Sequence, residues 1–230
     1  MPTSKNLNII SGVIFDLDGT LLNTLEDIAC SMNTVLKRHK FPTHSIDTYR
    51  TFIGQGLAPL AKRAIQYHHN NGMSVDTIIN ELYIEYEKTL TRKTNYYKGI
   101  SELLDELTSL NIPMAILSNK HDFLTKMLAQ HYFQKWPFKI ISGAKPDFPK
   151  KPDPFLALEI LKNFGIKSEE CIFIGDTQTD IETAIGAGMF PIGVLWGFRD
   201  RDTLLEAGAK LIVEKPSEIL DFISNNTITA

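Results

Sequence analysis

The sequence predicts an α/β fold: a Rossmann-like parallel-sheet core with an inserted all-helical cap domain. Short apolar runs alternate with segments of helical period along most of the chain, which is typical of a parallel sheet with helices on its faces. The alternation fails once, between about residues 24 and 92, where helical patterns follow one another without an apolar run between them. A strand-to-helix connection normally takes about 2–6 residues, so this stretch predicts an inserted domain.

Six apolar runs are predicted to form the strands of the sheet. Most are short and continuously apolar, as in strands that are buried on both faces. They lie at residues 13–15, 114–117, 140–141, 172–174, 192–195 and 211–213.

Two core helices carry clear signals. The segment SELLDELTSL, residues 101–110, places four leucines on one helical face. The segment DPFLALEILKNFG is predicted to begin with Asp153 as its N-cap and Pro154 after it, and to end at Gly165.

The inserted segment is predicted to form an α-helical cap of residues 23–92, and residues 1–22 plus 93–230 to form the core. The sequence TLED resembles a capping box, with Thr24 as the N-cap and Asp27 three residues later, and apolar residues follow it at helical spacing. The segment SVDTIINELYIEYEKTL repeats this helical pattern. The cap is therefore expected to contain several helices.

Composition excludes several classes of protein. The 230 residues are 43% hydrophobic, and their formal charge of -3 is too small and too scattered to predict a nucleic-acid or membrane partner. Cys30 and Cys171 lie far apart, and no segment approaches the roughly 18 apolar residues of a membrane helix. His68 and His69 are interpreted as solvated residues at a helix end. We expect a cytoplasmic protein, a monomer or a homodimer, that acts on a small molecule.

Polar residues follow three of the apolar runs and predict the site. Asp16, Ser118 and Asp176 each come at such an end, Asp180 lies four residues further, and Lys151 precedes a helix start. Ligands of an open parallel sheet bind outside the carboxyl ends of its strands. Carboxylates without histidine or cysteine favour a hard divalent cation, for which we predict Mg2+. With the cation and the lysine present, an anionic phosphate can approach the carboxylates.

The spacing of the first two aspartates suggests two roles. Asp16 can attack phosphorus, and Asp18, one step further round a turn that Gly19 permits, can protonate the leaving oxygen and later activate water. Thr20 and Ser118 offer hydroxyl groups to the transferred phosphoryl group.

Four motifs in order resemble those of the haloacid dehalogenase-like hydrolases. They are DLDGT, LSN at residues 117–119, Lys151 in KKPDP, and GDTQTD at residues 175–180. The resemblance implies an aspartyl-phosphate mechanism with Asp16 as the nucleophile and Asp18 as the acid and base. Asp18 argues for phosphate chemistry, since the namesake dehalogenases lack this second aspartate.

The resemblance also implies the remaining assignments. It implies that Ser118, Asn119 and Lys151 bind phosphate. It implies that Mg2+ is held by Asp16, by the backbone carbonyl of Asp18 and by Asp176, with Asp180 in the outer shell.

The substrate is less sharply defined than the reaction. The stretch IGQGL, which contains Gly54, Gln55 and Gly56, resembles a stretch near the substrate in the cap of phosphoglycolate phosphatases, and it can equally be a flexible turn before a helix. We expect hydrolysis of a small phosphate monoester, with 2-phosphoglycolate as the leading candidate. Pyrophosphatases, nucleotide phosphatases and sugar-phosphate mutases carry the same core motifs and stay as alternatives. A phosphorylatable binding module without turnover is the rival from another class.

Overall fold

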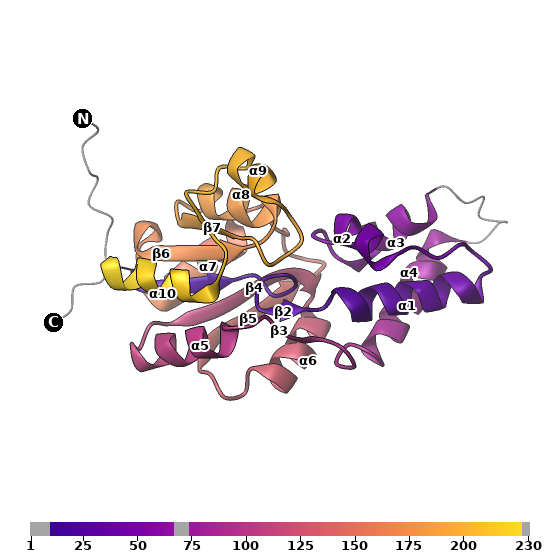
Figure 1. The fold of residues 1–230 in the computed structure, drawn as a ribbon, viewed down its shortest axis with the longest axis horizontal. Coiled ribbons are helices and arrows are strands. Elements are labelled where there is room, and N and C mark those ends of the chain that lie inside the picture. The colour runs from indigo at the N-terminus through magenta and orange to yellow at the C-terminus, as the bar shows by residue number, and fades with distance from the viewer. Residues whose placement is uncertain (1–9, 67–73, 227–230) are drawn as a thin grey trace.

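The computed structural model of the protein describes residues 10–66 and 74–226. His68 and His69 lie outside the described residues. Figure 1 shows two groups of elements, a sheet with helices on both faces and a second group of helices beside it. In the described part of the chain, no helix is both long enough and apolar enough to cross a membrane.

The core is a six-stranded sheet whose neighbours pair in parallel, in the order β5-β4-β1-β6-β7-β8. All six predicted strands are confirmed, and with them the predicted fold class. The strand β4 runs on to His121, past the predicted end at Leu117, with a register irregularity between these two residues. The strands are β1 Gly12–Phe15, β4 Met114–His121, β5 Phe138–Ala144, β6 Cys171–Gly175, β7 Phe190–Val194 and β8 Leu211–Val213.

Helices bury both faces of this sheet. Val13 and Phe15 belong to the apolar cluster that contains side chains of α5, α6 and α10, whereas Ile14 belongs to the cluster with side chains of α7 and α8. Successive residues of a strand point to opposite faces, so β1 contributes to both layers. The core helices are α5 Ile100–Ser109, α6 Asp122–Tyr132, α7 Phe155–Phe164, α8 Gln178–Gly186, α9 Arg201–Glu206 and α10 Pro216–Asn225.

The start of α7 differs slightly from the prediction. Pro154 occupies the N-cap position, and the Asp153 carboxylate, one residue earlier, accepts a hydrogen bond of 2.9 Å from the backbone N–H of Phe155. The helix ends at Gly165 as predicted, where φ is 71°.

Four helices follow one another between β1 and β4. They are α1 Leu25–Arg38, α2 Ile46–Phe52, α3 Leu57–Ile65 and α4 Val75–Glu87. Two short strands that the sequence did not predict flank them, β2 Leu22–Asn23 and β3 Asn95–Tyr96, which pair antiparallel with each other. The division into a core of 1–22 plus 93–230 and a cap of 23–92 stays a prediction, and we use "cap helices" below for α1 to α4.

The capping box predicted at the start of α1 is wrong. Thr24 lies at the N-cap position without a side-chain capping bond, and its hydroxyl donates to Asp18 at 2.8 Å instead. The Asp27 carboxylate accepts hydrogen bonds from the backbone N–H groups of Lys93 and Thr94 and from the Thr94 hydroxyl. Partners distant in sequence have replaced the local ones, and they join the first cap helix to the segment that returns to the core.

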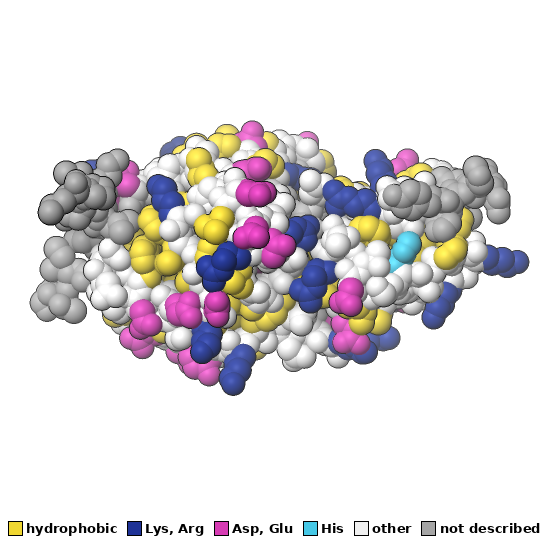
Figure 2. All heavy atoms as spheres, turned by 45° about the horizontal axis from the view of Figure 1, so that its top comes forward, with side chains coloured by type: hydrophobic (Ala, Val, Ile, Leu, Met, Phe, Trp, Pro, Cys, Tyr) yellow, Lys and Arg dark blue, Asp and Glu magenta, His cyan; other side chains and the backbone are white. Residues whose placement is uncertain are grey.

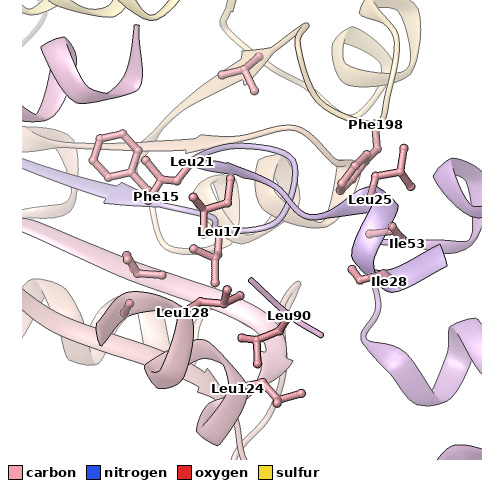
Figure 3. Close-up of a cluster of buried hydrophobic side chains, with 14 of the residues drawn as sticks. Phe15, Leu17, Leu21, Leu25, Ile28, Ile53, Leu90, Leu124, Leu128 and Phe198 are labelled. Atoms are coloured by element: carbon pink, nitrogen blue, oxygen red, sulfur yellow. The ribbon is translucent and has the colours of Figure 1, made fainter. Parts of the chain in front are cut away.

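One apolar cluster extends from the sheet to the cap helices. Figure 3 shows Phe15, Leu17 and Leu21 of the core in the same view as Leu25, Ile28 and Ile53 of the cap helices and the segments beside them, and all six belong to one buried cluster. On the surface, acidic and basic side chains are interspersed over the face that Figure 2 shows, in agreement with the small net charge.

We expect Asp27→Asn to lower the free energy of unfolding by about 1–3 kcal/mol, because it weakens a buried acceptor of several hydrogen bonds. Asp27 is 2% exposed. Urea unfolding measures the change, and Asp47→Asn, at an exposed position in the first turn of α2, is the matched control. Equal stability of the two variants would contradict this role for Asp27.

Candidate active site

Three of the predicted site residues meet at one edge of the sheet. Asp16 follows β1, Ser118 lies in β4 and Asp176 follows β6, and β1 pairs with both of the other strands. The backbone N–H of Asp16 continues the ladder by donating to Ile174 at 2.9 Å. The carboxyl ends of neighbouring parallel strands therefore bring these side chains together, as predicted from the sequence.

A cluster of three carboxylates occupies this edge. Oxygens of Asp16, Asp176 and Asp180 lie within 4.8 Å of one another, and all three residues are buried. Asp176 is held by the Thr20 hydroxyl at 3.0 Å and by the backbone N–H of Phe198 at 2.8 Å. Thr20 thus lies at the predicted site, but its hydroxyl is directed at a carboxylate.

Asp180 owes its position to the start of α8. Thr177 is the N-cap of this helix, and its backbone N–H and hydroxyl both donate to Asp180, at 3.0 and 2.7 Å. On the other side, the Lys151 ammonium group donates to Asp16 at 2.8 Å and to Asp180 at 2.6 Å. Lys151 therefore links the first motif to the last.

The burial of these groups shifts their pKa values. Burial, opposed by the charge of Lys151, raises the pKa of Asp16 to about 7. Burial and the charges of Asp180 and Asp16 raise the pKa of Asp176 well above its usual range. Burial alone would lower the pKa of Lys151, but the charges of Asp16 and Asp180 outweigh it and raise that pKa. One ammonium group therefore does not compensate three carboxylates.

The cluster has the chemistry of a divalent-cation site. Its donors are carboxylate oxygens, which hard cations such as Mg2+ prefer, and its charge is left uncompensated by the lysine. Gly19 adapts the first motif to this geometry, because its φ is +92° and a Cβ there would lie 2.3 Å from an Asp176 oxygen. The residues present could thus hold a metal ion.

Asp18 has a different environment from Asp16. Its carboxylate forms an ion pair with Lys120, with Nζ–O distances of 2.8 and 2.7 Å, and accepts the hydrogen bond from Thr24. Its side chain is not part of the carboxylate cluster. The sequence analysis missed Lys120, although this residue lies only two positions after Ser118.

A small cavity adjoins Asp16 and Asp18. Its volume is about 30 Å³, and the residues that line it come from both the core and the cap helices with their connections. They are Asp16, Asp18, Ile28, Ile53, Gly54, Gly56, Leu57, Leu60, Ser118, Asn119 and Lys120.

The predicted cap residues divide between two environments. Gly54 and Gly56 line the cavity, whereas Gln55 is exposed and accepts a hydrogen bond of 2.6 Å from Arg63. The Asn119 amide donates to the carbonyl groups of Lys151 at 3.0 Å and Gly54 at 3.3 Å. Asn119 therefore connects the Gly54 loop to the core.

Two arginines, which the sequence analysis also missed, connect the same parts of the chain. Arg50 donates to the Gly197 carbonyl at 2.7 Å, and Arg199 donates to the carbonyls of Arg50 and Ile53 at 2.8 and 2.7 Å. Their acceptors are backbone carbonyl groups, so no pattern of side chains in the sequence could predict these contacts. These contacts hold residues 53–60, the turn before α3 with its first helical turn, over the edge of the sheet, and we call this segment the cap loop below.

The metal-free protein should lose stability as pH rises. The pKa of Asp16 is raised from 3.8 to about 7 in the folded state, so the stabilisation from its bound proton is present below pH 3.8 and is lost as pH rises through 7. We expect the urea concentration at the unfolding midpoint of EDTA-treated protein to fall as the pH is raised from about 5 to about 8. Addition of Mg2+ should restore the midpoint. Asp16→Asn should reduce this pH dependence, and an identical profile in the variant would contradict the assignment.

Comparison with known proteins places this geometry in a family. The profile of the haloacid dehalogenase-like hydrolases matches residues 13–194. A phosphoglycolate phosphatase of Chromobacterium violaceum is 30% identical over 223 residues, which are 96% of this chain and 99% of that protein.

Solved structures of related proteins have the same fold. The crystal structure of a predicted phosphoglycolate phosphatase from Haemophilus somnus has a TM-score of 0.86 at 25% identity, with 93% of this chain and 97% of that chain covered. A protein of Thermotoga maritima proposed to be a β-phosphoglucomutase shares the fold, with a TM-score of 0.76 at 22% identity and coverage of 94% and 99%. The four motifs, their strand ends and these matches together show that the chain belongs to the haloacid dehalogenase-like hydrolase family.

Proposed function

We propose that this protein hydrolyses a small phosphate monoester through a phosphoenzyme formed on Asp16, with Mg2+ as its cofactor and 2-phosphoglycolate as the leading candidate substrate. The observation that carries the proposal is the division of two carboxylates between two environments. Asp16 lies against Lys151 in the carboxylate cluster, and Asp18, two residues later, lies outside that cluster and forms an ion pair with Lys120. One carboxylate can therefore attack phosphorus while the other handles the proton.

The reaction would proceed in two displacements. In the first, an Asp16 oxygen attacks phosphorus, the ester P–O bond breaks, and Asp18 donates a proton to the departing alkoxide. In the second, Asp18 takes a proton from water, the water oxygen attacks phosphorus, and the acyl-phosphate bond breaks. Inorganic phosphate leaves, and the Asp16 carboxylate is regenerated.

The remaining side chains of the site would bind the phosphoryl group and the metal. We assign Mg2+ to Asp16, the Asp18 carbonyl and Asp176, with Asp180 in the outer shell. The metal would supply positive charge that offsets the phosphate and the carboxylates. Lys151, Ser118, Thr20 and Asn119 would bind phosphate oxygens, with Lys151 already 2.8 Å from the nucleophile. For this, the Thr20 hydroxyl would turn away from Asp176, and the Asn119 amide from the carbonyl groups of Lys151 and Gly54.

The cap loop would exclude water during the first displacement. Ile53, Leu57 and Leu60 present apolar side chains to the cavity, and a dry site strengthens the charge interactions in it. A cavity needs roughly 10–15 Å³ to hold one water molecule, so a volume of about 30 Å³ leaves room for few water molecules beside the reacting groups.

The names of the relatives support the same substrate. The Chromobacterium violaceum protein is a phosphoglycolate phosphatase, and 2-phosphoglycolate has one of the smallest leaving groups among phosphate esters. The mutase alternative rests on the structural likeness to the Thermotoga maritima protein.

We expect Asp16→Asn to lower kcat for phosphate release by about 10³-fold or more, because it removes the nucleophile. Phosphate release at saturating Mg2+ measures the loss. Asp202→Asn, in the exposed first turn of α9, is the control and should retain activity. Hydrolysis that survives the Asp16 change would contradict the phosphoenzyme mechanism.

A substrate panel tests the preference itself. We expect kcat/KM for 2-phosphoglycolate to exceed that for pyrophosphate, nucleoside monophosphates and hexose phosphates by about 100-fold, which is about 2.7 kcal/mol of transition-state discrimination. Interconversion of hexose phosphates without net release would indicate a mutase instead.

A further inference from the structure

Lys120 is a buried lysine that the proposed reaction does not yet use. It lies near the end of β4, is 3% exposed, and directs its ammonium group at both Asp18 oxygens, at 2.8 and 2.7 Å. The same group lies 4.7 Å from the centre of the Tyr86 ring. Removing an ion pair from water can cost more free energy than the pair returns, so stability alone does not account for this buried lysine.

Lys120 lines the cavity beside Asp18, the proposed proton donor. Among the described residues that line this cavity, Lys120 is the single cationic one, and the wall contributed by Ile28, Ile53, Leu57 and Leu60 is apolar. Lys151 does not line the cavity and is paired with Asp16 and Asp180. The two lysines therefore lie in two different parts of the site.

We infer that Lys120 determines specificity by binding a carboxylate on the alcohol part of the substrate. The inference rests on the proposed function and deepens it. The substrates selected are phosphate esters of short hydroxy acids, in which the carboxylate lies within one or two carbons of the ester oxygen. Neutral alcohol groups of the same size would lack the ionic contact.

The donor geometry of Lys120 permits this contact. An ammonium group has three N–H donors, and the two bonds to Asp18 leave one of them. Within residues 10–66 and 74–226, Asp18 is the one carboxylate that forms an ion pair with Lys120. A substrate carboxylate can thus bind Lys120 without displacing Asp18.

The test compares two esters that differ in one group. 2-Phosphoglycolate and 2-hydroxyethyl phosphate have the same chain length, and the second has a hydroxymethyl group where the first has a carboxylate. The variant Lys120→Met removes the charge with little change in length, and Lys120→Arg keeps the charge. Lys126→Met is the matched control, because Lys126 is exposed and pairs with Asp122 on α6.

We expect the wild type and Lys126→Met to prefer 2-phosphoglycolate by roughly 100-fold in kcat/KM. Lys120→Met should reduce this preference to less than about fivefold, mainly through a higher KM for 2-phosphoglycolate, and Lys120→Arg should recover part of it. Equal losses on both esters would show that Lys120 only positions Asp18 and would overturn the inference.

The wild type alone keeps the inference testable if Lys120→Met does not fold. Hydrolysis of both esters with less than about threefold difference would overturn the inference and leave the phosphatase proposal standing. Inhibition by glycolate and not by ethylene glycol would support it. If neither these esters nor the wider panel released phosphate, the proposed function itself would fail, and the inference with it.

Discussion

The crowding of three buried carboxylates at one edge of the sheet is the constraint on which the rest of the structure depends. Asp16, Asp176 and Asp180 come from different motifs, and their oxygens lie within 4.8 Å of one another. Lys151, Thr20, Thr177 and the backbone of Phe198 bind these oxygens. The glycine turn after Asp16 leaves space where a Cβ would overlap Asp176. Much of the surrounding sequence thus serves to hold these three carboxylates close together.

The cap loop adds the second part of the site. Arg50, Arg199 and Asn119 fasten it to the core through backbone carbonyls, and it covers Asp18 and Lys120 with apolar side chains. The result is a site with two separate ion pairs, Lys151 with Asp16 and Lys120 with Asp18. In our account, the first pair serves the phosphoryl group, and the second serves the proton and the leaving group.

The features that the sequence predicted correctly depend on local pattern. Short apolar runs identified all six strands, and the polar residues after them placed Asp16, Ser118 and Asp176 at one edge because the topology of parallel sheets demands it. Lys151 was predicted from its position shortly before the start of a helix, and Asp180 from its position in the first turn of the next one.

The features that the sequence did not predict depend on partners far along the chain. The capping box failed because Asp27 binds residues 66 and 67 positions away. Lys120 was missed because its partner Asp18 lies 102 positions away. The short strands β2 and β3 carry too few residues for any periodicity, and the arginines bind carbonyl groups that every residue possesses.

The central claim is that phosphorus becomes bonded to Asp16 during turnover, and trapping that bond tests it most directly. Asp18→Asn should still be phosphorylated by 4-nitrophenyl phosphate, whose leaving group needs no proton, but should hydrolyse the acyl phosphate slowly. Mass spectrometry of acid-quenched, protease-digested variant should then find one phosphoryl group on the peptide that contains Asp16. Release of several equivalents of 4-nitrophenol with that peptide unmodified throughout would contradict the account.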